Sequence, residues 1–160
     1  MKIPTFELIV EIHEVVLEVS EGRPGIHVEN DIRRASERPL TYINYVDEYD
    51  LDTICAILID SIARYHGFED GNKRTALMTA IFTYRANGVH FKATMLMNKR
   101  FDALVMWVVR KKPEIPEIEE RLKKLRAEFE VSSGQPLNKM LTSFAKMRIR
   151  KNSSKRNKSQ

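Results

Sequence analysis

The chain has 160 residues, of which 42% are hydrophobic and 31% charged, a balance typical of a soluble globular domain with one core. No apolar run reaches the roughly 18 residues that a membrane-spanning helix needs. Residues 1–5 lack the basic and then apolar pattern of a secretory signal peptide. The single cysteine, Cys55, excludes an internal disulfide. These features predict a cytoplasmic protein without membrane association.

The net charge of +5 is concentrated at the C-terminus. From Lys139 onward the chain has eight Lys or Arg residues and no acid, so the rest of the chain carries a net charge of −3. We expect residues 151–160 to be disordered. A basic tail can bind nucleic acid or another anionic surface, but it can equally serve only to keep the chain soluble, and both alternatives stay open.

Apolar residues recur at helical spacing through most of the chain, which predicts an all-α fold. Pro113 and Pro116 mark a linker before the last predicted helices. Residues 40–46 are rich in aromatic and β-branched side chains and favour a short strand or hairpin, with a connecting loop as the alternative. The helices are expected at residues 5–20, 30–37, 52–65, 72–86, 94–111, 117–130 and 137–149.

The most polar stretch of the middle of the chain, residues 66–74, separates the two most apolar predicted helices. It contains one imidazole, two carboxylates, two glycines, one amide and two cations. Such a mixture is costly to bury but well suited to binding phosphate. Asn72, Lys73 and Arg74 fall in the first turn of a helix, where free N–H groups and the helix dipole attract anions. Cations are disfavoured there, so a negatively charged ligand is expected.

Each side chain of this stretch has a plausible chemical role. The unperturbed pKa of a histidine lies near neutrality, so His66 can accept a proton from a hydroxyl. Asp70 offers oxygen ligands of the kind that Mg²⁺ uses together with substrate phosphates. Gly71 permits close approach of the backbone to a ligand. Lys73 and Arg74 can bind phosphate as a point charge and as a fork. Together these groups indicate transfer of a phosphate-containing group to a hydroxyl.

The stretch resembles the signature of the Fic/Doc family, whose Fic branch reads H-P-F-x-[D/E]-G-N-G-R. The matching residues are His66, Phe68, Asp70, Gly71, Asn72 and Arg74. Gly67 stands where the signature has proline, and Lys73 stands where it has glycine, as in the Doc branch. Leu77 stands where Fic enzymes often have a second arginine, which again resembles Doc. The resemblance covers roughly residues 5–111.

The resemblance implies a Fic/Doc-like helical catalytic domain at 1–112. Beyond it, where the resemblance ends, apolar spacing and charge predict a helical extension at 113–150 and the basic tail at 151–160. In the family a β-hairpin flap holds the target segment by strand addition. The resemblance assigns that role to residues 38–46, and in particular to Tyr42, Ile43 and Asn44. It does not assign a role to His13, for which a contact between helices is the favoured interpretation and a catalytic role the alternative.

A Doc-like protein is expected to transfer the γ-phosphate of ATP, with Mg²⁺, to a hydroxyl of a target protein, with a translation elongation factor as the leading candidate. His66 would be the catalytic base and Asp70 the metal ligand. Gly71, Asn72, Lys73 and Arg74 would bind the nucleotide. The family's inhibitory motif [S/T]-x-x-x-E-[G/N] is absent from the sequence, so a separate antitoxin chain is the expected restraint. The alternatives are transfer of AMP, as in Fic enzymes, and a non-catalytic binding module built around the basic tail.

Overall fold

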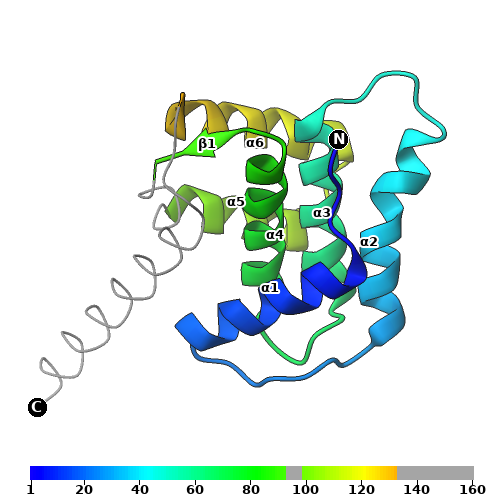
Figure 1. The fold of residues 1–160 in the computed structure, drawn as a ribbon, viewed down its shortest axis with the longest axis vertical. Coiled ribbons are helices and arrows are strands. Elements are labelled where there is room, and N and C mark those ends of the chain that lie inside the picture. The colour runs from blue at the N-terminus through cyan, green and yellow to red at the C-terminus, as the bar shows by residue number, and fades with distance from the viewer. Residues whose placement is uncertain (93–98, 133–160) are drawn as a thin grey trace, which may run out of the picture.

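The computed structural model describes residues 1–92 and 99–132, and within these ranges the chain is almost entirely helical (Figure 1). Two very short strands complete it. The all-α class predicted from the sequence is confirmed. The elements are α1 (Phe6–Val19), α2 (Glu29–Ile43), α3 (Leu51–Tyr65), α4 (Asn72–Ala86), β1 (His90–Phe91), α5 (Lys99–Lys111), α6 (Ile115–Phe129) and β2 (Glu130–Val131).

Helix α3 forms the centre of the molecule and packs against α2, α4, α5 and α6, while α1 packs against α4 and α2. Its residues from Asp52 to Ala63 are all buried, and the buried Asp60 among them is paired with Arg38 and Arg64. The side chain of Asp50 accepts a hydrogen bond from the backbone N–H of Thr53 and forms a capping box with it. The two central helices therefore hold the connection between them, residues 66–71, firmly at both ends.

Helix α2 differs from the sequence prediction. It continues through Pro39 to Ile43, so the predicted end near residue 37 and the predicted strand or hairpin at 40–46 are both wrong. Tyr42 lies in the last turn and Asn44 is the C-terminal cap. Ile32, Ala35, Ser36 and Pro39 are all buried and keep helical spacing across the proline. Burial against α3 therefore outweighs both the β propensity of this segment and the hydrogen bond that proline removes.

A two-stranded antiparallel sheet does exist, but it joins distant parts of the chain. His90 pairs with Val131 and Phe91 with Glu130, which ties the end of α4 to the end of α6. The predicted helices left residues 87–93 between two of them and included Glu130 in the helix at 117–130. Strands of two residues are too short for the alternating pattern by which a strand is predicted.

Helix α6 packs directly on α3. It begins at Ile115, before the predicted start at 117. Pro116 is tolerated in the first turn, because the backbone N–H that proline lacks would have no acceptor within the helix at that position. Ile115, Ile118 and Leu122 are buried in the same hydrophobic core as α3 and α5. The division of the chain at residue 112 stays a prediction, but α6 shares the core of the helices before it.

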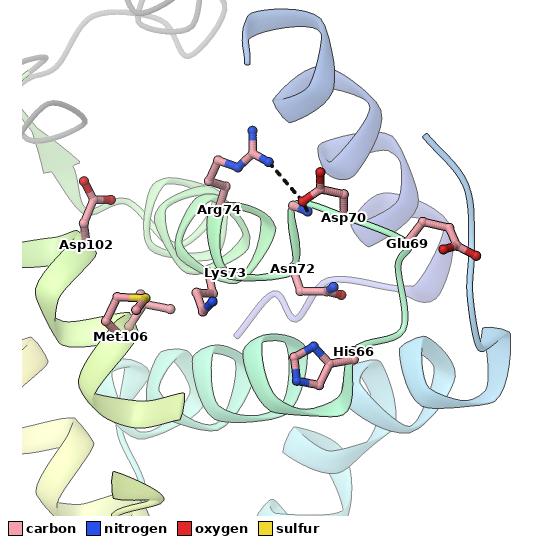
Figure 2. A pocket seen from close by; sticks show the side chains of 10 residues that line it. His66, Glu69, Asp70, Asn72, Lys73, Arg74, Asp102 and Met106 are labelled. Carbon is pink, nitrogen blue, oxygen red and sulfur yellow. Dashed lines mark hydrogen bonds and ion pairs between the residues drawn. The ribbon is translucent and has the colours of Figure 1, made fainter. Parts of the chain in front are cut away.

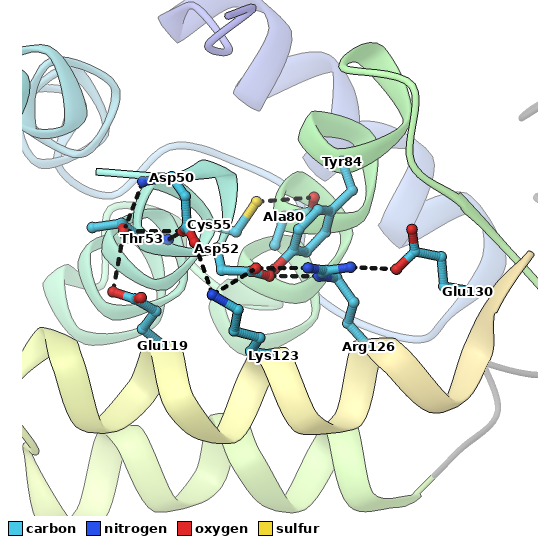
Figure 3. A network of polar contacts seen from close by, with 10 residues as sticks. All are labelled: Asp50, Asp52, Thr53, Cys55, Ala80, Tyr84, Glu119, Lys123, Arg126 and Glu130. Carbon is cyan, nitrogen blue, oxygen red and sulfur yellow. Dashed lines mark hydrogen bonds and ion pairs between the residues drawn. The ribbon is translucent and has the colours of Figure 1, made fainter. Parts of the chain in front are cut away.

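A buried ion pair fixes α6 to the start of α3 (Figure 3). Arg126 donates from Nε to Oδ1 of Asp52 over 2.6 Å and from Nη2 to Oδ2 over 2.7 Å. Tyr84 of α4 donates its hydroxyl to the same carboxylate over 2.6 Å. Burial beside Asp52 raises the pKa of Tyr84 far above its usual range, so the hydroxyl stays protonated. This Asp52 cluster thus joins α3, α4 and α6 by hydrogen bonds that are satisfied internally.

The predicted helix at 94–111 is confirmed from Lys99 onward, and its first residues lie outside the described ranges. The predicted helix at 137–149 and the predicted disordered tail at 151–160 also lie outside them. In the part of the chain that the structure describes, no helix is long and apolar enough to cross a membrane.

Candidate functional site

The connection between α3 and α4, here called the signature loop (residues 66–71), reverses the chain with two left-handed residues. His66 ends α3 at φ 55° and ψ 42°, and Gly71 precedes α4 at φ 78°. Glycine adopts this conformation freely, whereas histidine adopts it at a cost in free energy. Strain of this kind at a non-glycine residue is typical of functional sites. It places the His66 ring at the exposed rim of the loop (Figure 2).

The side chain of Asn72 closes the signature loop from within. Its Oδ1 accepts a hydrogen bond from the Phe68 N–H over 3.0 Å, and its Nδ2 donates to the Phe68 carbonyl over 2.9 Å. Asn72 was predicted to bind nucleotide. Because its amide already bonds Phe68 at both atoms, what remains for an anion is the second hydrogen of Nδ2 and the backbone N–H, which lies in the first turn of α4.

His13 of α1 packs against the signature loop. Its ring stacks on Phe68 with 3.8 Å between ring centroids and 7° between planes, and Nε2 donates to the Asp70 carbonyl over 2.8 Å. Burial lowers the pKa of His13, and the hydrogen bond to the carbonyl opposes that effect only in part. The sequence analysis favoured a contact between helices for His13. The structure instead shows that the His13 ring contacts the signature loop, through Phe68 and the Asp70 carbonyl.

The outer edge of the loop is paired with residues 25–28. The N–H groups of His27 and Val28 donate to the Gly67 carbonyl over 2.8 and 3.0 Å, and the Glu69 N–H donates to the Gly25 carbonyl over 3.0 Å. A Cβ on Gly67 would lie 2.4 Å from Cγ1 of Ile32. The glycine found where the Fic signature has proline is therefore required by the close approach of α2.

Asp70 and Arg74 lie beside each other where the loop meets α1. Asp70 accepts hydrogen bonds from the N–H of Gly71 over 2.7 Å and of Arg23 over 3.3 Å. These two backbone bonds, with smaller help from Arg74, lower the pKa of Asp70 and keep it ionised at neutral pH. Arg74 donates to Asp70 over 3.5 Å, to the Glu21 carbonyl over 2.8 Å and to the hydroxyl of Ser20.

The donor set fits Mg²⁺ bound jointly with a phosphate ligand. Within residues 1–92 and 99–132, no group of three or more His, Cys, Asp or Glu side chains is arranged to hold a metal ion. Asp70, however, is ionised and its side chain is 44% exposed. One carboxylate completed by phosphate oxygens and water is a common way for proteins to hold Mg²⁺.

These residues line one open cleft of about 530 Å³ (Figure 2). Lys73 is exposed in it and has no ion pair with any residue of the described ranges. The opposite wall of the cleft comes from α5. The sequence analysis did not predict this wall, because no motif links residues of α5 to a loop some thirty positions earlier. The lining residues are His66, Glu69, Asp70, Gly71, Asn72, Lys73, Arg74, Asp102, Val105 and Met106.

The predicted flap residues lie elsewhere. Helices α2 and α3 run antiparallel, so Tyr42, Ile43 and Asn44 lie near the start of α3, whereas His66 lies at its end (Figure 1). A helix of 15 residues is about 22 Å long, and none of the three residues lines the cleft. The chain segment that does border the signature loop is residues 25–28.

The helical fold, the signature loop and the first turn of α4 are the features by which the sequence resembled the Fic/Doc family. Comparison with protein families gives the same result. Residues 4–83, half of the chain, match the Fic/DOC family, and the chain belongs to that family. Among curated proteins it is similar to "Protein kinase doc" of Escherichia phage P1, with 31% identity over 83 residues. That match covers 52% of this chain and 66% of the phage protein, and it supports the Doc-like branch.

Proposed function

We propose that this protein is a Doc-like toxin that transfers the γ-phosphate of ATP to a hydroxyl of a target protein. The observation that carries the proposal is the position of Lys73, exposed in the first turn of α4, in one cleft with His66 and Asp70. The name of the phage relative, a protein kinase, supports the same reaction.

His66 acts as the general base. The target hydroxyl gives its proton to the imidazole while its oxygen forms a bond to the γ-phosphorus. The bond from that phosphorus to the β–γ bridging oxygen breaks, and ADP leaves. The exposed ring of His66 at the rim of the cleft is accessible to a protein hydroxyl.

The N-terminus of α4 binds the phosphates. The backbone N–H groups of Asn72, Lys73 and Arg74 lack acceptors within the helix, and the helix dipole adds to their attraction for anions. The Lys73 ammonium neutralises phosphate charge directly, and Arg74 holds the position of Asp70. Mg²⁺, held by Asp70, would neutralise the charge of the phosphates during transfer.

Transfer of AMP is the second candidate, because Gly71 and Asp70 are also what the Fic signature requires. Lys73 distinguishes the two reactions. A lysine in the place of glycine fills space next to the phosphate site and adds a charge there. We propose that this favours the nucleotide orientation that presents the γ-phosphate to the target.

The target segment would dock beside residues 25–28 rather than at residues 42–44. Residues 25–28 run alongside the signature loop, with one antiparallel bridge between Ile26 and Phe68, and Ile26 and Val28 are 41% and 38% exposed. Exposed apolar side chains on a segment bonded to the loop of the proposed catalytic base suit contact with a target peptide. A translation elongation factor as the target, a separate antitoxin chain as the restraint and a cytoplasmic location are proposals that follow from the resemblance to the Doc branch.

The test uses the purified full chain, Mg²⁺, a purified translation elongation factor or a bacterial lysate, and ATP labelled at either the γ- or the α-phosphate. Label transferred from the γ position alone, lost in His66→Ala and retained in His90→Ala, is the expected result. Label from the α position would replace the proposal with AMP transfer. Absence of His66-dependent label from both would reject the enzymatic proposal for those targets.

Two further variants separate the remaining alternatives. Lys73→Gly restores the glycine of the Fic signature and is expected to lower γ-transfer by at least about tenfold, as for loss of a charged contact to the transferred group. Deletion of residues 139–160 should leave His66-dependent transfer intact. Loss of all function on that deletion would favour a binding module built on the basic tail.

A further inference from the structure

The signature loop contains a second carboxylate, Glu69, to which the proposed reaction gives no role. Glu69 lines the same cleft as His66, and its side chain is 41% exposed. Its backbone N–H donates to the Gly25 carbonyl over 3.0 Å, which fixes the position of the residue. Glu69 thus holds a carboxylate in a defined place at the rim of the cleft, three residues after the proposed catalytic base.

In the part of the chain that the structure describes, the Glu69 side chain has a single partner, His27. Nδ1 of His27 lies 3.3 Å from Oε1 of Glu69, and the His27 side chain is 60% exposed. An exposed pair of this kind contributes little to stability. Three backbone hydrogen bonds already join residues 25–28 to the loop, so the pair is not needed to hold the two segments together. No group within residues 1–92 and 99–132 bonds Oε2, which is therefore available to a ligand.

The cleft carries opposite charges on two of its sides. The Lys73 ammonium and the N-terminus of α4 are positive and suit the phosphates of a nucleotide. Figure 2 shows the Glu69 side chain directed away from Lys73, toward the segment that leads into α2. A carboxylate repels phosphate, so Glu69 does not suit the nucleotide. It faces residues 25–28, where the target segment is proposed to dock, and its charge there favours a cationic group of that segment.

We propose that Glu69 selects target segments that carry a lysine or arginine within three residues of the accepting hydroxyl. This selection rests on the proposed phosphate transfer and defines the substrate class of the same cleft. The ammonium or guanidinium of the target donates to Oε2 of Glu69 while the hydroxyl reaches His66. A target with an acid in the same place is repelled, so the contact discriminates between targets.

The spacing of His66 and Glu69 sets the spacing expected in the target. Three residues of chain span at most about 11 Å, so the backbones of these two residues lie within that distance. An extended target chain covers the same distance within about three residues. Ile26 and Val28, which flank His27 in the sequence, are 41% and 38% exposed and offer apolar contact beside the carboxylate. The preferred target segment therefore combines one cation with apolar neighbours.

The test is phosphorylation of peptides by the purified full chain with Mg²⁺ and ATP. The peptides are a chymotryptic digest of a dephosphorylated bacterial lysate, because chymotrypsin leaves lysine and arginine inside peptides, and the intact lysate is treated in parallel. Mass spectrometry identifies the residues that the parent protein phosphorylates and His66→Ala does not. At one or more of the three positions on either side of these residues, lysine and arginine should occur at least about threefold above their background frequency.

The outcomes separate this inference from the proposed function. Phosphorylation that depends on His66 but shows no such enrichment would overturn the inference and leave the proposed function standing. Absence of His66-dependent phosphorylation in both the digest and the intact lysate would reject the proposed function, and the inference with it.

Variants of Glu69 test whether this side chain is the source of the preference. Glu69→Gln should remove the enrichment, and Glu69→Lys should reverse it in favour of aspartate and glutamate, because like charges repel. The matched control is Glu48→Lys, which makes the same charge change at an exposed residue before α3, at the other end of that helix from the cleft. The control should keep the preference of the parent protein.

An enrichment that persists in both Glu69 variants, or that changes equally in Glu48→Lys, would overturn the inference. Loss of transfer to every peptide in Glu69→Gln would also overturn it, because a residue that only selects the target is not required for the reaction itself.

Discussion

The two ends of helix α3 carry polar clusters of similar composition and opposite character. At its start, Asp52 is 3% exposed and its carboxylate bonds Arg126 and Tyr84. At its end, His66 and Asp70 of the signature loop lie with Lys73 and Arg74 of α4 at the edge of an open cleft. Both clusters contain a carboxylate and an arginine. The first is closed by internal hydrogen bonds, whereas the second presents charged groups to solvent, which is what a ligand site requires.

The contrast indicates that the Asp52 cluster stabilises the fold, whereas the groups at the cleft are available for chemistry. Replacing one member of the Asp52 cluster should therefore affect folding, and replacing an exposed member of the signature loop should affect activity. The loop also has its own supports, His13, Gly67 and Asn72, whose substitution should affect both. Four predictions test this division, from the largest expected effect to the smallest.

The largest expected effect is that of His66→Ala on phosphate transfer. Removal of a general base lowers the rate by about 10² to 10⁴-fold. Because the ring is exposed, the melting temperature should stay within a degree or two of the parent protein. Transfer is measured with labelled ATP, and unfolding by circular dichroism. A large loss of stability would show that His66 contributes to folding, like the members of the Asp52 cluster.

Arg126→Ala should destabilise the fold by about 3 kcal/mol, because the buried Asp52 carboxylate then keeps only the Tyr84 hydroxyl at 2.6 Å and the Lys123 ammonium at 4.0 Å as partners. The matched control is Arg100→Ala, which removes an exposed pair to Glu128 and should cost under about 1 kcal/mol. Urea denaturation measures both. Equal effects of the two substitutions would contradict the assignment of the Asp52 cluster as the structural end of α3.

Gly67→Ala should destabilise the protein by about 1–3 kcal/mol, since the added methyl group would lie 2.4 Å from Ile32. The double variant with Ile32→Ala should show a smaller cost than the sum of the single changes, because the clash is removed. Urea denaturation of all four proteins gives this coupling. A strictly additive result would mean that Ile32 does not limit the space at Gly67.

The smallest expected effect is a pH dependence of stability from His13. Its pKa in the folded protein lies below the ordinary value of 6.5, so the unfolded chain binds the proton more readily. The contribution of neutral His13 to the free energy of unfolding is therefore complete above pH 6.5. It is lost as the pH falls from 6.5 toward the lowered pKa of His13 in the folded protein. His13→Gln should remove this part of the pH dependence, which urea denaturation between pH 7 and pH 5 measures. An unchanged slope would assign it to other groups.

The gathering of these residues in one cleft could be predicted because they lie within nine positions of one another in the sequence. His66, Asp70, Gly71, Lys73 and Arg74 meet through one turn, so their order along the chain already implies their proximity. The flap could not be predicted in the same way. Tyr42 and Ile43 have β-favouring side chains, but α2 continues through them because its buried face packs on α3.

The sequence alone determined the helical class, the boundaries of α4, and the set of groups at the turn before it. These depend on local spacing and on residue type. The tertiary structure decided the α5 wall of the cleft, the support of the loop by His13, and the closure of Asp52 by Arg126. Each joins residues 28 or more positions apart in the sequence. No local pattern encodes such contacts, because they arise only when whole helices pack.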